Sequence, residues 1–260
     1  MELKIKSEGK CLFCGKTFAK AGINRHLATH LSEKVSGSDS GKSFLVKIET
    51  GKNWGSAPYF LSLWIDGEAK MEELDTFLRN IWLECCGHLS AFTNPKRKTG
   101  HGWNISNAMN LFAGGNAKAI EAMMDDTDGE IPMSRKTKNA LHKGLVLAYE
   151  YDFGSTTKLT VTVIDEYPIK ADEKIILLSR NEPLEINCSI CGKVPATQVC
   201  TVCMYDEDSA FCDKCAKKHA KACPDFADYA SMPVVNSPRM SVCGYKGGTI
   251  DKERDGVYKM

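Results

Sequence analysis

The alternation of hydrophobic and polar positions is strongest in the middle of the chain. At Phe44, Val46 and Ile48, apolar residues fall on every second position and therefore share one face of a predicted strand. Residues 59–65 carry large apolar side chains at odd and even positions alike, which indicates a strand that is covered on both sides. A further short strand is predicted at 88–92.

From Met71 onwards the hydrophobic spacing becomes that of a helix. The apolar positions that form one stripe along this helix are Leu74, Phe77, Leu78, Ile81, Trp82 and Cys85. Because Cys85 falls on the stripe, the pattern favours a core position for its thiol over a reactive one.

Two shorter helices and a hairpin are predicted next. One helix spans 116–124 with Asn116 as its N-cap, and the other runs from Ser134 to Gly144, a glycine suited to ending a helix. The inward-facing positions of the hairpin are Leu145, Leu147, Tyr149, Tyr151, Thr157, Leu159, Val161 and Val163. With a last strand at 174–179, this order predicts an α+β domain with a central mixed or antiparallel sheet and helices.

A first group of candidate metal ligands lies near the N-terminus: Cys11, Cys14, His26 and His30. The two histidines are four residues apart and share one helix face, as joint ligation of a zinc ion requires. The segment resembles the classical zinc finger with two Cys and two His ligands. Phe18 and Ile23 match the small core of that family, although one residue is missing between the second Cys and the first His.

Eight further candidate ligands lie close together near the C-terminus: Cys188, Cys191, Cys200, Cys203, Cys212, Cys215, His219 and Cys223. The segment resembles the cross-braced zinc modules of the B-box and MYND type. That resemblance implies that the first and third Cys pairs share one ion, and that the second pair shares another with the last His and Cys. A segment of this size needs such metal staples to fold, so structural Zn²⁺ is expected, with three ions in the whole chain.

On this basis the chain divides into five segments. They are a single zinc finger at 1–33, a flexible linker at 34–43, the α+β domain at 44–180, the two-zinc module at 183–225 and a C-terminal tail at 226–260. The linker contains "GSDSGKS", which nearly matches a phosphate-binding loop. Ser36 stands where that loop needs glycine, and a strand follows where it needs a helix, so no nucleotide site is predicted.

Composition and charge narrow the functional classes. The net charge is +1, so no overall field draws the chain to nucleic acid or to an anionic membrane. The charged start is unlike a signal peptide and no apolar run could span a bilayer, so a cytoplasmic, reducing location and no membrane association are expected. Cys85, Cys86 and Cys243 are left without an assigned role.

Nucleic-acid contact is weighed at two places. In the finger, the positions that read bases in such helices are Ala19, Gly22 and Arg25, of which only Arg25 could bond to a base. The finger is nevertheless basic, so contact with phosphates remains open. The segment 94–103 combines Lys96, Arg97, Lys98 and His101 with Trp103. This combination suits the binding of single-stranded nucleic acid, although a solvated loop is favoured.

A cluster of acidic residues is formed by Asp125, Asp126, Asp128 and Glu130. It indicates an exposed turn rather than a calcium-binding loop.

The middle domain carries a recognisable sequence signature. Residues 149–161 read "YEYDFGSTTKLTV" and follow "LDTFLRNIWLECCGHLSAF" at 74–92. This combination resembles the plasmid Ri ORF-3-like family. The resemblance implies an α+β fold without an established reaction, in proteins often associated with mobile elements. Many members continue with Asp, Trp and His where this chain has Ser155, Thr157 and Leu159, so a polar site of such relatives is incomplete here.

The sequence therefore favours a non-catalytic zinc-binding adaptor. A protein partner is expected, with weak, non-specific nucleic-acid contact as a second interaction, and the oligomeric state stays open. The alternative is a mobile-element-associated enzyme or nuclease-like protein that acts through the middle domain. A pocket lined by Asp152, His88 and His142 would favour this alternative, although no catalytic residue is assigned from the sequence.

Overall fold

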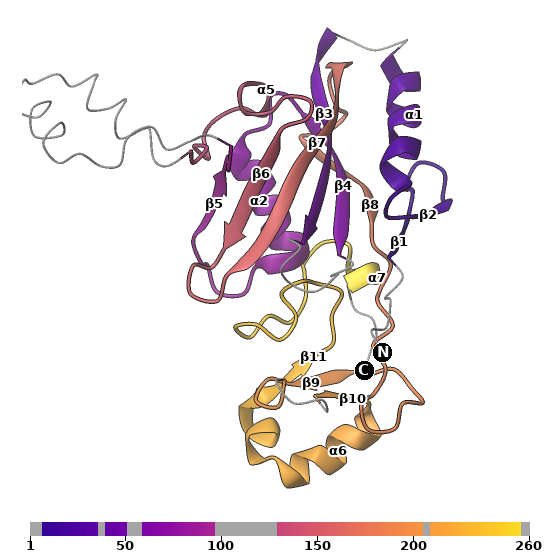
Figure 1. Cartoon of the computed structure of the whole chain (residues 1–260), viewed down its shortest axis with the longest axis vertical. Helices are drawn as coiled ribbons and strands as arrows, with labels where there is room; N and C mark the ends of the chain where they lie inside the picture. The colour runs from indigo at the N-terminus through magenta and orange to yellow at the C-terminus, as the bar shows by residue number, and fades with distance from the viewer. Residues whose placement is uncertain (1–6, 36–39, 51–58, 97–128, 205–208, 256–260) are drawn as a thin grey trace, which may run out of the picture.

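One six-stranded antiparallel sheet forms the centre of the protein, as the α+β prediction requires (Figure 1). The computed structural model describes residues 7–35, 40–50, 59–96, 129–204 and 209–255. In spatial order the strands are β5 (Ser90–Thr93), β6 (Val146–Tyr151), β7 (Thr157–Ile169), β3 (Ser40–Thr50), β4 (Phe60–Asp66) and β8 (Ile175–Arg180). Each neighbouring pair is antiparallel.

The two central strands bury side chains on both faces of the sheet. Phe44, Val46 and Ile48 of β3 lie in the larger hydrophobic core, whereas Leu45 points into a second core on the opposite face. The same division runs along β4, where every residue is buried. Both sequence predictions for these strands are confirmed. The eight inward-facing hairpin positions predicted in β6, β7 and the residue before β6 are also buried.

The larger core is covered by α2 (Met71–Leu78), which continues into a π-helical turn, η1 (Arg79–Leu83). The wider turn buries Ile81, Trp82 and Leu83 in succession. The helix ends there, because Glu84 is extended. Cys85 therefore does not continue the helical stripe, and its side chain is only half-buried at the edge of the core.

Some predicted element boundaries are wrong. The helix expected from Ser134 to Gly144 is the single turn α5 (Thr137–Ala140), and Leu141 is already extended. Gly144 has a φ of 81°, but it lies in the turn before β6 and does not cap a helix. The strand expected at 88–92 is β5, which begins at Ser90. The helix expected at 116–124 lies outside the described residues.

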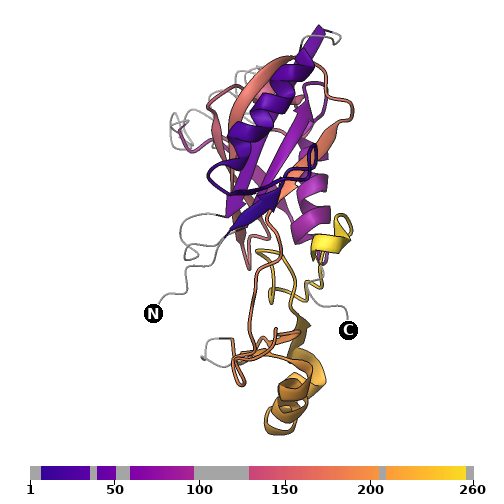
Figure 2. The same cartoon turned by 90° about the vertical axis from the view of Figure 1, so that its right-hand side faces the viewer.

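The second core lies under the N-terminal module. Strands β1 (Glu8–Lys10) and β2 (Thr17–Ala19) form a small hairpin, and α1 (Ile23–Val35) follows. The buried face of α1 consists of Ile23, Leu27 and Leu31, which pack with Trp64 of β4. Figure 2 shows α1 lying along one face of the sheet. The last part of the expected linker, 40–43, belongs to β3.

The C-terminal module lies beyond one end of the sheet (Figure 1). It contains β9 (Gln198–Cys200), β10 (Ala210–Phe211), α6 (Asp213–Ala222), the π-helical turn η2 (Phe226–Ala230) and β11 (Ser231–Pro233). The chain then returns to the central domain and ends its described part with α7 (Lys252–Asp255). None of the helices in the described ranges is long and apolar enough to cross a membrane.

The returning segment packs into the central domain and is not a free tail. Arg239 is fully buried, as is Arg180 at the end of β8. Arg180 forms ion pairs with Asp251 at 3.2 Å and with Asp255 at 2.6 Å. The C-terminal residues therefore complete the core that the sheet begins.

Candidate metal centres

The structure brings the four ligands of the N-terminal finger together, with one ligand atom of each within 4.8 Å of all the others. The Nε2 atom of His26 lies 3.2 Å from Cys14 Sγ and 3.1 Å from His30 Nε2. In a zinc tetrahedron with bonds of about 2.0 to 2.3 Å, neighbouring ligand atoms are separated by roughly 3.3 to 3.8 Å. The donor set and its spacing therefore fit a four-coordinate zinc ion.

The local turn that presents the cysteines is the same at both ends of the chain. Gly15 and Gly192 follow the second Cys of their pairs and have φ values of 73° and 62°. Each glycine donates its N–H to the carbonyl of the first Cys, at 2.8 Å in both cases. Glycine allows this left-handed backbone, and both pairs share the sequence Cys-x-x-Cys-Gly-Lys.

The eight C-terminal ligands fall into two separate sets. One set contains Cys188, Cys191, Cys212 and Cys215, and the other contains Cys200, Cys203, His219 and Cys223. This is the division that the cross-braced resemblance implied. Each set has four donors, which is typical of a closed structural zinc site, whereas a catalytic zinc keeps an open position.

The backbone favours the thiolate form of Cys188. Burial raises the pKa of this thiol, but hydrogen bonds from the N–H groups of Cys191, Cys212 and Ile190 outweigh it, and the pKa falls to about 6. A thiol must lose its proton to bind a metal, so these N–H groups favour metal binding.

A phenylalanine supports one histidine ligand in each zinc module. Phe18 stacks on His26 with ring centroids 4.1 Å apart, and Phe211 stacks on His219 at 4.2 Å. The stacking fixes the ring planes, which orients the ligand nitrogens.

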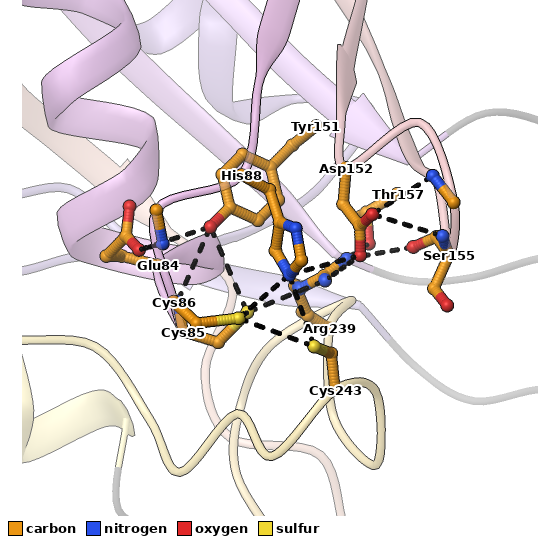
Figure 3. Close-up of polar contacts among 12 residues, drawn as sticks. Glu84, Cys85, Cys86, His88, Tyr151, Asp152, Ser155, Thr157, Arg239 and Cys243 are labelled. Atoms are coloured by element: carbon orange, nitrogen blue, oxygen red, sulfur yellow. Dashed lines mark hydrogen bonds and ion pairs between the residues drawn. The ribbon is translucent and has the colours of Figure 1, made fainter.

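A fourth group of Cys and His residues was not predicted from the sequence (Figure 3). Cys85, Cys86, His88 and Cys243 each place a ligand atom within 4.8 Å of the others. The sequence interpretation left the three cysteines without an assigned role and named His88 as a lining residue of a possible enzyme pocket. The available signal was three unassigned cysteines together with a histidine in "CCGH".

Arg239 and Asp152 lie directly beside this fourth group (Figure 3). Arg239 Nη2 donates to Cys85 Sγ at 3.6 Å and also to the carboxylate of Asp152. The hydrogen bond from Arg239 lowers the pKa of Asp152 to about 2. Burial raises the pKa of Cys85, but the hydrogen bond and charge of Arg239 outweigh it, so this pKa lies below its ordinary value.

The pocket that would favour an enzyme is not assembled as expected. His88 Nε2 does lie 3.6 Å from Asp152 Oδ2. His142, however, precedes β6 while Asp152 follows it, so the two residues lie at opposite ends of that strand. Ser155 and Thr157 stand where ORF-3-like relatives carry Asp and Trp, and both accept hydrogen bonds from Arg239.

The candidate nucleic-acid positions are only partly described. Helix α1 begins at Ile23, so Ala19 lies in β2 and Gly22 precedes the helix, while Arg25 is exposed. The basic residues Arg97, Lys98 and His101 with Trp103, and the acidic residues Asp125, Asp126 and Asp128, lie outside the described residues. Lys96 and Glu130 are described and exposed.

Comparisons with other proteins give no family assignment. No protein-family model matches the chain, and no curated protein matches it. The chain is similar to the crystal structure of MM3350, a protein of unknown function from Methanosarcina mazei Go1, with 14% identity and a TM-score of 0.36. The similarity covers 54% of this chain and 68% of that one. A similarity this low gives no information about function, so the proposed function has to be argued from the chemistry of the sites.

Proposed function

We propose that the protein is a non-catalytic zinc-binding adaptor that holds a segment of a partner protein on its C-terminal module. The chain's Cys/His clusters could bind metal, and we infer that the three sets predicted from the sequence hold structural Zn²⁺. The observation that carries the adaptor role is an open groove beside the first C-terminal cysteine set.

The groove combines apolar and basic side chains. Ile190, Val194 and Pro195 line it, and all three are exposed. Ile190 keeps 56% of its surface exposed and Val194 keeps 45%. Large apolar side chains that remain open to solvent around one groove are typical of an interaction site.

Three lysines indicate the charge of the partner. Lys193, Lys214 and Lys218 line the same groove and are exposed. None of them forms an ion pair with a carboxylate within the described ranges, and the one acid in the groove lining, Asp213, accepts a hydrogen bond from Thr197. The partner segment is therefore expected to be acidic, with apolar anchors.

The packing of the finger supports a structural role for that module. One face of α1 is buried against the sheet, and Lys20 and Lys34 pair with Glu49 and Asp172. These contacts reduce the positive charge that the finger offers to phosphates. Nucleic-acid contact and membership of the ORF-3-like family remain predictions from the sequence.

Binding of synthetic peptides tests the proposal. A peptide of Asp and Glu residues with two Leu or Phe anchors is expected to bind, as followed by fluorescence anisotropy. Val194→Glu or Lys214→Glu should weaken this binding by about tenfold or more, because one replaces an apolar contact with a repelling charge and the other reverses an attractive charge. Val202→Glu and Lys217→Glu are matched controls that should bind normally, since Val202 is also 45% exposed and neither residue lines the groove.

Two results would contradict the adaptor. One is equal binding of the peptide by the groove variants and their controls. The other is a preference for single- or double-stranded oligonucleotides over the acidic peptide, with binding that weakens steeply with salt. Zinc analysis of the same preparation tests the metal assignment separately, because Cys200→Ser should release one ion per chain while leaving the groove residues in place.

A further inference from the structure

We propose that Cys85, Cys86, His88 and Cys243 form a fourth metal site, which takes a divalent ion of the zinc type and fastens the C-terminal segment to the central domain. This site is independent of the adaptor groove. It joins residues far apart in the sequence, with His88 and Cys243 separated by 155 positions along the chain.

The spacing of the ligand atoms matches a tetrahedral ion. Cys85 Sγ and Cys86 Sγ are 3.8 Å apart, and Cys86 Sγ and Cys243 Sγ are 3.6 Å apart. His88 Nε2 lies 2.9 Å from Cys86 Sγ and 3.2 Å from Cys243 Sγ. Two thiolates on one zinc are separated by about 3.8 Å, and a thiolate and an imidazole nitrogen by roughly 3.5 Å. The spacing therefore resembles that of the N-terminal finger ligands.

The backbone on the domain side is shaped to present three ligands from four residues. After the π-helical turn ends, Gly87 adopts a φ of 75° and donates its N–H to Glu84 Oε1 at 2.6 Å. This turn brings His88 back beside Cys86. A π-helical turn followed by a tight reversal is a common setting for a functional site.

The backbone on the C-terminal side is strained where it presents Cys243. Cys243 has a φ of 48° and Ser241 has a φ of 68°, a region that residues other than glycine rarely adopt. Such strain persists only where surrounding contacts fix the chain. The fixed points here are Arg239 and Tyr245, which are both fully buried on either side of the turn.

The neighbouring charges suit three thiolates on a divalent ion. That assembly would carry one net negative charge, and the guanidinium of Arg239 donates directly to Cys85 Sγ. Arg239 is itself held by Asp152, the Ser155 carbonyl and Thr157 Oγ1. Its position is therefore set by the hairpin between β6 and β7 and not by the cysteines.

Asp152 does not compete as a fifth ligand. Its Oδ2 accepts from Arg239, and its Oδ1 accepts from the N–H groups of Gly154 and Ser155 at 3.0 and 3.2 Å. The four remaining donors make a closed set, which indicates a structural ion rather than a catalytic one.

Native mass spectrometry of the full chain, purified with reductant and loaded with zinc, tests the site. The wild-type chain should carry four ions. Cys243→Ser and His88→Ala should each carry three, whereas His142→Ala is the matched control and should keep four, because His142 is an exposed histidine outside all four groups. Circular dichroism of each variant identifies any that fails to fold.

Alkylation of the wild-type protein gives an answer without variants. Cys86 and Cys243 are exposed, so without a bound ion both thiols should be accessible to iodoacetamide. Zinc should slow their alkylation at least tenfold, and a chelator should restore it. Three ions on the wild-type chain, four ions on Cys243→Ser, unprotected alkylation with zinc, or a Cys86–Cys243 disulfide in reductant would each overturn the site.

Discussion

Single buried charges hold the C-terminal segment against the sheet. Arg180 is fully buried at the end of β8, and its partners Asp251 and Asp255 come from the end of the described chain. Removing one partner of a buried ion pair leaves an uncompensated charge, which costs more than the pair itself contributes. At this scale the protein depends on a few residues that hydrophobic patterning does not reveal.

Arg180→Met is therefore expected to destabilise the protein by about 3 kcal/mol, because it leaves the buried side chain of Asp255 without its ion-pair partner. Arg254→Met is the control, since the ion pair of Arg254 within the described residues is with Asp251 in a more exposed position. This change should cost about 1 kcal/mol or less. Urea unfolding at a fixed zinc concentration measures both. Equal losses in the free energy of unfolding for the two variants would show that the buried ion pair contributes no more to stability than the exposed one.

The hydroxyl of Tyr167 predicts a pH effect. It is buried and has no hydrogen-bond partner among the described residues, and burial raises its pKa to about 12, assisted by the negative charge of Asp165. In the unfolded chain this pKa is about 10. Because the folded state holds the proton more tightly, the stability from this group is full below pH ~10 and is lost as the pH rises towards 12.

Tyr167→Phe should thus be neutral or stabilising by up to about 2 kcal/mol at pH 7.5, because it removes an unsatisfied buried hydroxyl. The variant should also lose less stability than the wild type between pH ~10 and ~12. Tyr229→Phe serves as the control, because Tyr229 is exposed and its change should alter neither quantity. A strong destabilisation of Tyr167→Phe at neutral pH would reveal a hydrogen bond that the structure does not contain.

At the scale of elements, α1 contributes as much to the sheet as to its own finger. Its three buried residues reach the second core, and Asn24 accepts a hydrogen bond from Ser62 of β4 at 2.8 Å. The finger and the sheet therefore share one hydrophobic layer. Substitutions on this face of α1 should lower the stability of the sheet as well.

Leu27→Ala should destabilise the protein by about 2 to 4 kcal/mol, because it opens a cavity between α1 and the sheet. Thr29→Ala lies on the exposed side of the same helix and should change stability by no more than about 0.5 kcal/mol. The fluorescence of Trp64, which lies in this core, reports the unfolding midpoint, although the other tryptophans also contribute. An unchanged midpoint in Leu27→Ala would mean that the finger folds independently of the sheet.

The strands were predictable because their signal is local. Alternation at Phe44, Val46 and Ile48 reflects burial on one face, and the doubly apolar segment 59–65 reflects burial on two. The prediction of a long helix after Ser134 was wrong. The helical turn there is only four residues long, and a single turn gives little periodicity in the sequence. The π-helical turn was missed because an apolar stripe continues through it with only a slight shift.

At the scale of the whole molecule, the central sheet and the C-terminal module differ in the size of their hydrophobic cores. The sheet has two extensive hydrophobic clusters, whereas the C-terminal module has two small ones. One is made largely of the cysteines themselves with Phe211 and Phe226, and the other consists of Ala196, Val199, Ala210, Met232 and Val234. With so little apolar core, that module is expected to depend on the metal ions that we propose for it.

Removal of zinc should unfold the C-terminal module before the sheet. In hydrogen–deuterium exchange with a strong chelator, segments 198–200 and 213–222 should lose protection, because their core is small and metal-dependent. Strands β3, β4 and β7 should stay protected. The returning segment at 241–245 should respond with the module if the fourth site is occupied, and simultaneous loss in all strands would contradict separate stabilities.

Three sets of candidate ligands were predictable because each is encoded by nearby residues. The Cys-x-x-Cys spacing of Cys11 and Cys14 is enough to predict a metal-ligand set, and the same holds for the C-terminal pairs. The fourth set has no such spacing, because Cys85 and Cys86 are adjacent and Cys243 joins them through the packing of the C-terminal segment, in which Arg239 and Tyr245 are fully buried. The sheet, the buried arginine and the turn must all form before those thiols meet, so sequence spacing could not reveal the group.

The long route from Arg180 to its partners has a consequence for biosynthesis. The two-zinc module is inserted in the chain between β8 and the carboxylates that neutralise this arginine. A ribosome completes every strand of the sheet well before it reaches Asp251 and Asp255. During that interval the nascent domain carries an unpaired Arg180 at its edge, and only the segment with Asp251 and Asp255 neutralises this charge. Premature stops downstream of the zinc module should therefore yield a protein whose zinc module is complete but whose central domain is a substrate for quality-control proteases.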